Sequence, residues 1–222
     1  FDDGVWMLDN NIFRHFDISN NLIHDDVGTI FEDRFGNIWI ATMGGVSKFG
    51  RAIFEIYDLD MGLPAVSIQS VYYDLSGRVW FGVLDHLFTI QGDKLLEIGE
   101  DQDFPPESQP FSFAEDQNHN IYIGTDNGLQ YFNGKSIEKE GLNKIVYSLL
   151  YTTDGQLWCG TDSGVHILKN DEFQLLGKED GLVNLKVNSI MQMDNVVCCA
   201  TEGGLSLFDL SGQHIRNYTE ED

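Results

Sequence analysis

The sequence is built around one unit that recurs along its whole length. Its fullest copy reads Gly-Asn-Ile-Trp-Ile-Ala-Thr-Met-Gly-Gly-Val over residues 36–46. Each copy has an aromatic residue at the same place, except the last, which has a cysteine. These residues are Trp39, Trp80, Tyr122, Trp158 and Cys198, at steps of 41, 42, 36 and 40 residues. A repeat of this length restricts the chain to architectures in which each copy is one supersecondary unit that packs on its neighbours.

Within each copy, hydrophobic residues alternate with period two, which is typical of β-strands. In the first full copy the pattern predicts strands at 27–32, 38–42, 46–49 and 53–57. Four short strands per copy and a period of about 40 residues predict an all-β fold: a β-propeller of four-stranded antiparallel blades.

The strand count predicts about five and a half blades. Residues 5–8 match the third strand of the unit and residues 12–16 match the fourth, so the first blade is half present. We expect the chain to be part of a longer protein. The predicted segments are a half blade at 1–20 and blades at 21–61, 62–103, 104–140, 141–180 and 181–222.

Polar turns and glycines mark the ends of the strands. An Asp-rich turn such as residues 33–37 precedes the second strand, and it contains residue types that tolerate a positive φ. A glycine opens the third strand in four copies, at a place where we expect a conformation closed to β-carbons. These glycines are Gly45, Gly128, Gly164 and Gly204, and His86 replaces them in the second copy. Threonines end four of the second strands, and we expect their hydroxyls to bond the turn backbone.

The charge balance limits the classes of molecule that the chain can bind. Thirteen basic and 36 acidic side chains give a net charge of −23, which disfavours nucleic acid because phosphate binding depends on Lys and Arg. Neutral sugars and protein surfaces remain open. No apolar run approaches the roughly 18 residues of a membrane span. Cys159, Cys198 and Cys199 fall inside strand patterns, where we interpret them as buried core thiols.

The motifs of the repeat follow one another in the order Gly-Leu, then Val-x-x-Ile-x-x-Asp, then Gly-Asn-Ile-Trp-Ile-x-Thr-x-x-Gly-Val. This order closely resembles the two-component regulator propeller repeat. The resemblance implies part of a seven-bladed propeller in the periplasmic sensor region of a hybrid histidine kinase or related receptor. Many such receptors in gut bacteria sense carbohydrate fragments. It also implies partners: an oligosaccharide ligand, the remaining propeller and signalling domains, and a second copy in a dimer. The second copy of the repeat departs from the pattern at Val83 and His86, and the fifth lacks the tryptophan.

Metal and catalytic chemistry find little support in the sequence. The turn at 116–120 resembles the start of a calcium loop, but Ile121 stands where glycine is needed and Asn127 where glutamate is needed. The six histidines are scattered through the repeat without a metal-ligand or Ser-His-Asp spacing. We therefore predict no metal, no cofactor and no enzyme activity. A lyase activity like that of the related streptogramin B lyases is the less favoured alternative.

Residues that break the repeat in loops are the best candidates for ligand contact, since a repeat protein varies the loops that meet its ligand. We expect the loops between blades and the loops between second and third strands to share one face. The candidates on it are His24, Asp25, Asp85, His86, Glu107, Gln109, Asn127, Lys144, Asn184 and Lys186. The Asp85–His86 pair departs most from the repeat, and Phe104 is the main aromatic of these loops. The aromatic positions of the second strands are interpreted as packing between blades.

Two functions remain open at this point. A ligand on the loop face would change the packing of the propeller against its neighbours and so bias a dimeric receptor. Alternatively, the propeller is a scaffold whose face holds another protein. A glycan site predicts exposed aromatics in a concave face, whereas a protein partner predicts a flatter patch of roughly 800 Å².

Overall fold

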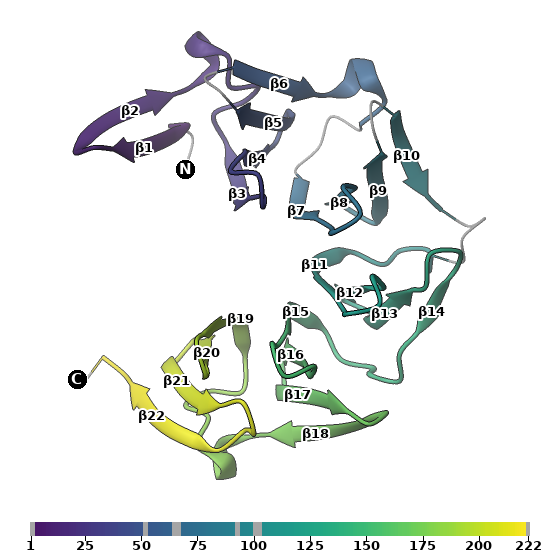
Figure 1. Cartoon of the computed structure of the whole chain (residues 1–222), viewed down its shortest axis with the longest axis vertical. Helices are drawn as coiled ribbons and strands as arrows, with labels where there is room; N and C mark the ends of the chain where they lie inside the picture. Colours follow the sequence, from purple (N-terminus) through teal and green to yellow (C-terminus); the bar gives the residue numbers. More distant parts are fainter. Residues whose placement is uncertain (1–2, 51–52, 64–67, 92–93, 100–103, 221–222) are drawn as a thin grey trace. The chain divides into compact units, whose positions relative to one another are not determined.

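The computed structural model describes residues 3–50, 53–63, 68–91, 94–99 and 104–220. These residues form six antiparallel sheets, five of four strands and one of two (Figure 1). The chain divides into two compact units, Phe1–Gly99 and Glu100–Asp222. The β-propeller class predicted from the repeat is confirmed.

The first unit holds one two-stranded and two four-stranded sheets. The two-stranded sheet pairs β1 (Val5–Asp9) with β2 (Ile12–Phe16). The next sheet is β3 (Val27–Glu32), β4 (Ile38–Thr42), β5 (Gly45–Gly50) and β6 (Ile53–Tyr57). The third is β7 (Ile68–Tyr73), β8 (Val79–Val83), β9 (His86–Gln91) and β10 (Lys94–Ile98). The first strands β3 and β7 contact one another, so the two sheets pack side by side.

The second unit holds three four-stranded sheets. Their strands are β11 (Pro110–Glu115), β12 (Ile121–Thr125), β13 (Gly128–Phe132) and β14 (Ile137–Lys139); β15 (Val146–Tyr151), β16 (Leu157–Thr161), β17 (Gly164–Lys169) and β18 (Glu172–Leu176); and β19 (Val187–Met193), β20 (Val196–Thr201), β21 (Gly204–Asp209) and β22 (His214–Tyr218). The first strands β11, β15 and β19 contact in that order. Within each of these sheets the strands pair in sequence order, as expected for strands joined by short turns.

Short 3₁₀ helices follow the last strand of three sheets. They are η1 (Ile18–Asn20), η2 (Leu59–Met61) and η4 (Lys178–Asp180). Among the residues that the structure describes, no helix has the length and hydrophobicity needed to span a bilayer. The six segment boundaries proposed from the sequence stay predictions, and Asp103, at one of them, lies outside the described residues.

The core lies between neighbouring sheets, where the aromatic position of the second strand is buried. Trp39 is 2% exposed and stacks on Tyr57 of its own sheet at 5.8 Å. It also contacts Tyr73 of the next sheet, at 6.5 Å between ring centroids. Trp158 packs on Phe208 of the following sheet, at 6.4 Å. The predicted packing of these aromatic residues between blades is confirmed at both positions.

An aspartate six residues before the tryptophan explains why the turn and the aromatic residue recur together. Asp33 Oδ1 accepts hydrogen bonds from the backbone N–H groups of Phe35 and Asn37, both at 2.9 Å. Its Oδ2 accepts from Asn37 Nδ2 at 2.8 Å and from Trp39 Nε1 at 3.0 Å. Burial acts to raise the pKa of the Asp33 carboxyl, but these hydrogen bonds outweigh it and lower the pKa. Asp74 makes the equivalent bond to Trp80 Nε1, at 2.9 Å.

Trp158 lacks this aspartate. Thr152 stands at the equivalent place, and its hydroxyl bonds Asp154 and the Gln156 backbone instead. Trp158 Nε1 is consequently buried without a hydrogen-bond partner among the described residues. A buried donor left unpaired costs on the order of 1–3 kcal/mol.

A double replacement should repair this defect. Thr152→Asp supplies an acceptor for Trp158 Nε1, and Asp154→Asn removes the like charge that would face the new carboxylate. We expect the free energy of unfolding to rise by about 1 kcal/mol, measured by urea denaturation. Asp154→Asn alone is the control and should not stabilise. An unchanged or lower midpoint in the double variant would contradict this account of the turn.

The predictions for the strand-opening glycines, the threonine hydroxyls and the three cysteines are also confirmed. The strand-opening glycines have φ of +113° to +137°, and a β-carbon on Gly45 would lie 2.3 Å from the Tyr57 carbonyl oxygen. The threonine hydroxyls donate to the carbonyls of these glycines at 2.8–2.9 Å. Cys159, Cys198 and Cys199 are buried free thiols, and burial raises the pKa of Cys199 to about 12.

Candidate functional site

In three of the sheets the loop that leads into the blade meets the loop between its second and third strands, as the sequence predicts for a shared face. Met43 N donates to Asp26 O at 3.1 Å in the sheet β3–β6. In β11–β14, Gln109 N donates to Asp126 Oδ1 at 2.9 Å. In β19–β22, Lys186 Nζ donates to Glu202 Oε1 at 2.7 Å. We call these paired loops the loop face of each blade.

In the first unit, His24 and Asp25 hold the connecting loop in shape. His24 Nδ1 accepts from Asp26 N at 3.0 Å. Asp25 Oδ1 accepts from Ile18 N at 2.8 Å, and its carbonyl accepts from Gly4 N at 3.0 Å. The His24 ring and the Asp25 carboxylate therefore both stabilise the connecting loop through hydrogen bonds.

The Asp85–His86 pair forms a small exposed charge cluster with a residue that the sequence did not single out. His86 Nε2 lies 3.4 Å from Asp85 Oδ1, and His86 Nδ1 lies 2.7 Å from Glu97 Oε1. All three side chains are about half exposed. Because His86 replaces glycine, the turn differs here, and Leu84 takes the left-handed conformation with φ +50°.

In the second unit, Asn127 ties its loop to the connection before β11. Its Nδ2 donates to Glu107 O at 3.3 Å and to Ser108 Oγ at 3.0 Å. Glu107 has φ +58°, and Gln109 is held through its backbone. Phe104, the main aromatic of these loops in the sequence, is 5% exposed. Its ring belongs to the core.

Lys186 of the loop face contacts both a carboxylate and an aromatic ring. Besides its bond to Glu202, which raises its pKa, its ammonium lies 5.7 Å from the centre of the Tyr147 ring. Tyr147 also stacks on Phe111 at 6.0 Å, an aromatic pair that sequence reasoning missed. Asn184 Oδ1 accepts from Lys186 N at 3.0 Å.

Lys144 is exposed, and its positive charge affects the pKa of His166. Burial lowers the pKa of His166, and the positive charge of Lys144 lowers it further. The ten loop residues thus form small groups within individual blades, and their role in ligand contact stays a prediction.

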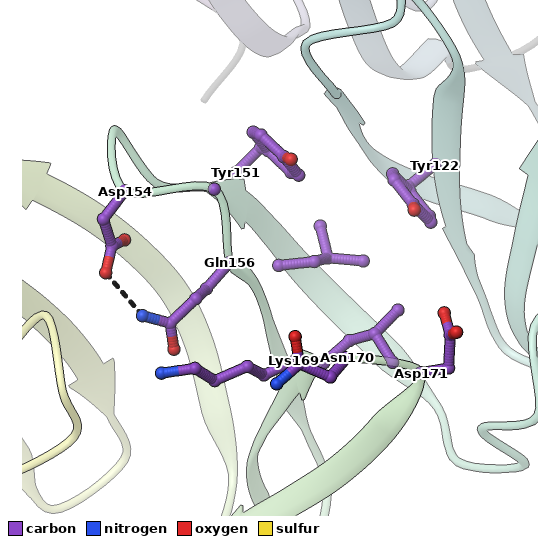
Figure 2. A pocket seen from close by; sticks show the side chains of 10 residues that line it. Tyr122, Tyr151, Asp154, Gln156, Lys169, Asn170 and Asp171 are labelled. Atoms are coloured by element: carbon purple, nitrogen blue, oxygen red, sulfur yellow. Dashed lines mark hydrogen bonds between the residues drawn. The ribbon is translucent and has the colours of Figure 1, made fainter.

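A cavity of about 280 Å³ lies at a different place in the second unit, between the sheets β11–β14 and β15–β18 (Figure 2). We call it the tyrosine pocket. Tyr122 of β12 and Tyr151 of β15 form part of its wall. The turn before β16 and the turn between β17 and β18 supply the remainder, and the full lining is Tyr122, Tyr151, Asp154, Gly155, Gln156, Leu157, Leu168, Lys169, Asn170 and Asp171.

Tyr122 packs on the core between its sheet and the next, as predicted, but it is less buried than the tryptophans at the same position of the repeat. It is half-buried and lines the pocket, whereas Trp39, Trp80 and Trp158 are at most 2% exposed. A phenol has no ring N–H to give to the turn aspartate, and Asp116 Oδ2 instead accepts from Asn120 Nδ2 at 2.9 Å. Within the described part of the chain, the Tyr122 hydroxyl makes no hydrogen bond.

The electrostatics of the pocket keep both phenols protonated. Burial raises the pKa of Tyr122, and the charges of Asp116 and Glu140 raise it further. Burial and Asp116 likewise raise the pKa of Tyr151. At neutral pH both groups are neutral hydroxyls that can donate and accept hydrogen bonds.

The described ranges contain no assembled group of potential metal ligands. No group of three His, Cys, Asp or Glu side chains in those ranges is placed to hold a metal ion. The arrangement offers instead hydroxyl, amide, ammonium and carboxylate groups around apolar surface, which is a composition suited to ligand binding.

Comparison with known proteins supports this architecture. The family described as two component regulator propeller matches residues 21–44. A search of curated proteins gives no match. Among solved structures, an extracellular domain described as that of a hybrid two-component system from B. thetaiotaomicron is 20% identical. Its TM-score is 0.81, and the match covers 98% of this chain and 31% of that one.

Two further structures have the same fold. An extracellular domain described as that of a one-component system from B. thetaiotaomicron has a TM-score of 0.77 and 20% identity, over 93% of this chain and 30% of that one. Virginiamycin B lyase from Staphylococcus aureus has a TM-score of 0.73 and 14% identity, over 87% of this chain and 70% of the lyase. This chain spans about a third of the length of the two extracellular domains. The chain therefore has the β-propeller fold, and its residues 21–44 match the two-component regulator propeller repeat.

Proposed function

We propose that the chain is a non-catalytic, ligand-sensing propeller module from the extracytoplasmic part of a signalling receptor, and that its ligand is a carbohydrate fragment. The observation that carries the proposal is the regulator propeller repeat at residues 21–44. The likeness in fold to the extracellular domain of a two-component system, over 98% of the chain, supports it.

The placement and partners follow from the same proposal. An extracytoplasmic module of this kind, periplasmic in a receptor of the inner membrane, works with further propeller blades and signalling domains and within a dimer. Its output depends on a difference in ligand affinity between two packings of the blades, since only differential affinity shifts such an equilibrium.

A thermal shift experiment tests the sensing function. The purified chain is heated with neutral disaccharides and trisaccharides, each well above its dissociation constant. A ligand at a hundred times its dissociation constant stabilises by about 2.7 kcal/mol, or about 5–10 °C in melting temperature for a chain of this size. At least one sugar should produce such a shift. If none does, the carbohydrate part of the proposal is wrong.

The likeness to virginiamycin B lyase makes a lyase the alternative that needs its own test. The chain is incubated with virginiamycin B and Mg²⁺, and the antibiotic is followed by mass spectrometry, with the lyase itself as positive control. We expect the antibiotic to stay intact, because the described residues assemble no group of three potential metal ligands. Conversion to a new product would contradict the non-catalytic assignment.

One observation favours a protein-binding scaffold as a second candidate. The β1–β2 sheet exposes large apolar side chains, with Trp6 59%, Leu8 58%, Ile12 60% and Phe13 67% accessible. Clustered exposed apolar residues mark interaction surfaces. A scaffold predicts that replacing Trp6 and Phe13 with serine abolishes partner binding while leaving any sugar shift intact.

A further inference from the structure

We propose that the tyrosine pocket binds one neutral sugar ring, held by the Tyr122 hydroxyl and the Asp171 carboxylate. The inference deepens the proposed carbohydrate-sensing function and rests on it. It places the ligand away from the loop-face residues, in a cavity of about 280 Å³ within the second unit. That volume is close to the lower end of small-molecule sites, about 300–1,000 Å³.

One side of the cavity is the turn before β16, which side-chain hydrogen bonds hold in place. Gln156 Nε2 donates to Asp154 Oδ2 at 2.5 Å and to Leu210 O at 3.1 Å. Gln156 is 6% exposed, and its Oε1 has no partner in the described part of the chain. These two bonds direct the Gln156 amide toward Asp154 and Leu210, and they fix the turn before β16 that forms one side of the cavity.

The turn between β17 and β18 fixes the opposite side. Asn170 and Asp171 have φ of +51° and +63°, the two successive left-handed residues of a type I′ hairpin turn. This conformation sets where Lys169, Asn170 and Asp171 project, and all three lie along the cavity (Figure 2). Ligand binding then needs little ordering of the backbone.

Tyr122 and the leucines supply the face for a sugar ring. A pyranose has C–H surface on its faces and hydroxyls around its edge, so it needs apolar or aromatic area next to groups that donate and accept. Leu157 and Leu168 provide apolar area, and Tyr122 combines a ring with a free hydroxyl. The Asn170 amide and the Asp171 carboxylate supply further polar groups from the turn between β17 and β18.

The charges around the pocket select a neutral ligand. Asp154 and Asp171 outnumber the single cation Lys169 among the lining residues. Glu140 adds a further acidic group close by; burial raises its pKa, and the charges of Asp171 and Glu138 raise it further. A uronate or a sulfated sugar would bring its own negative charge into this field, which is unfavourable.

The test is calorimetric titration of the full chain with neutral disaccharides: cellobiose, maltose, mannobiose, xylobiose and galactobiose. Digalacturonate is the anionic comparison and putrescine the cationic one. Tyr122→Phe removes one hydroxyl and keeps the ring. Asp171→Asn removes the charge and keeps a residue that tolerates the left-handed turn. Tyr131→Phe removes a hydroxyl from the ring 5.0 Å from Tyr122, outside the pocket lining, and serves as the matched control.

At least one neutral disaccharide should bind the wild-type chain. Its dissociation constant should rise about fivefold in Tyr122→Phe and more than tenfold in Asp171→Asn, as expected for a neutral and a charged hydrogen bond. The constant should stay unchanged in Tyr131→Phe. Melting temperatures of the three variants check that the fold is kept.

Three results would overturn the inference, and each has a different meaning. If a neutral sugar binds the wild type and both pocket variants equally, the pocket is wrong and the sensing function stands. If no neutral sugar binds the wild type, the pocket assignment and carbohydrate sensing both fail. If only digalacturonate or putrescine binds and the pocket variants weaken it, the site is right but the neutral class of ligand is wrong.

Discussion

Replacing Asp74 with alanine is expected to destabilise the chain by about 4 kcal/mol. Asp74 is fully buried, and its Oδ1 accepts from Ser76 N and Arg78 N, both at 2.9 Å. Its Oδ2 accepts from Arg78 Nε at 2.7 Å and from Trp80 Nε1 at 2.9 Å. Hydrogen bonds to a charged group contribute about 1.5–3 kcal/mol each, and buried donors that lose their acceptor cost further free energy.

Asp209→Ala is the matched control, because Asp209 caps a turn of the same kind without a tryptophan. Asp209 Oδ1 accepts from Ser211 N and Gln213 N at 2.9 Å, and the residue is only half-buried. We expect a loss of about 1 kcal/mol there, with both variants measured by urea unfolding and tryptophan fluorescence. Equal losses in the two variants would show that the bond to the indole contributes little.

Replacing Gly128 with alanine should cost about 3–4 kcal/mol, for a different reason. The residue has φ +113°, and its new β-carbon would lie 2.2 Å from the Leu142 carbonyl oxygen. That carbonyl accepts a bond from Leu129 N at 3.1 Å, so the backbone cannot move away without losing it. Strain in φ and a backbone clash therefore add together.

A second glycine separates these two effects. Gly134 also has a positive φ, +90°, but nothing lies within 4 Å of a β-carbon placed on it. Gly134→Ala should cost only the conformational strain, about 1–2 kcal/mol. If Gly128→Ala is no worse than Gly134→Ala in urea unfolding, close packing at the strand opening is not what requires glycine.

The sequence predicts most of the fold because the repeat states each local requirement several times. Four glycines at one place in the unit predict a positive φ there, and the structure has it. The Asp and Trp six residues apart mark a turn and a buried ring, which the hydrogen bonds of Asp33 and Asp74 explain. By the same comparison of copies, Thr152 at the aspartate position indicates that Trp158 lacks its acceptor.

The candidate site was harder to predict, for a physical reason. The tyrosine pocket is formed by the second strand of one blade and by strands and turns of the next, so no single copy of the repeat contains it. Tyr122 stands where tryptophan is otherwise buried, and the pattern predicts core packing for both. Phe104 shows the opposite case, since a loop position gives no sign that its ring is buried.

Hydrogen–deuterium exchange, with and without the best-binding neutral disaccharide, tests the central claim most directly. Binding in the tyrosine pocket predicts slower exchange in the turns around residues 153–156 and 169–171, and little change at the loop-face residues 24–25 and 184–186. Protection confined to the loop face would place the ligand at the residues predicted from the sequence and contradict the pocket. Exchange unchanged throughout the chain, at saturating sugar, would contradict ligand sensing by these blades.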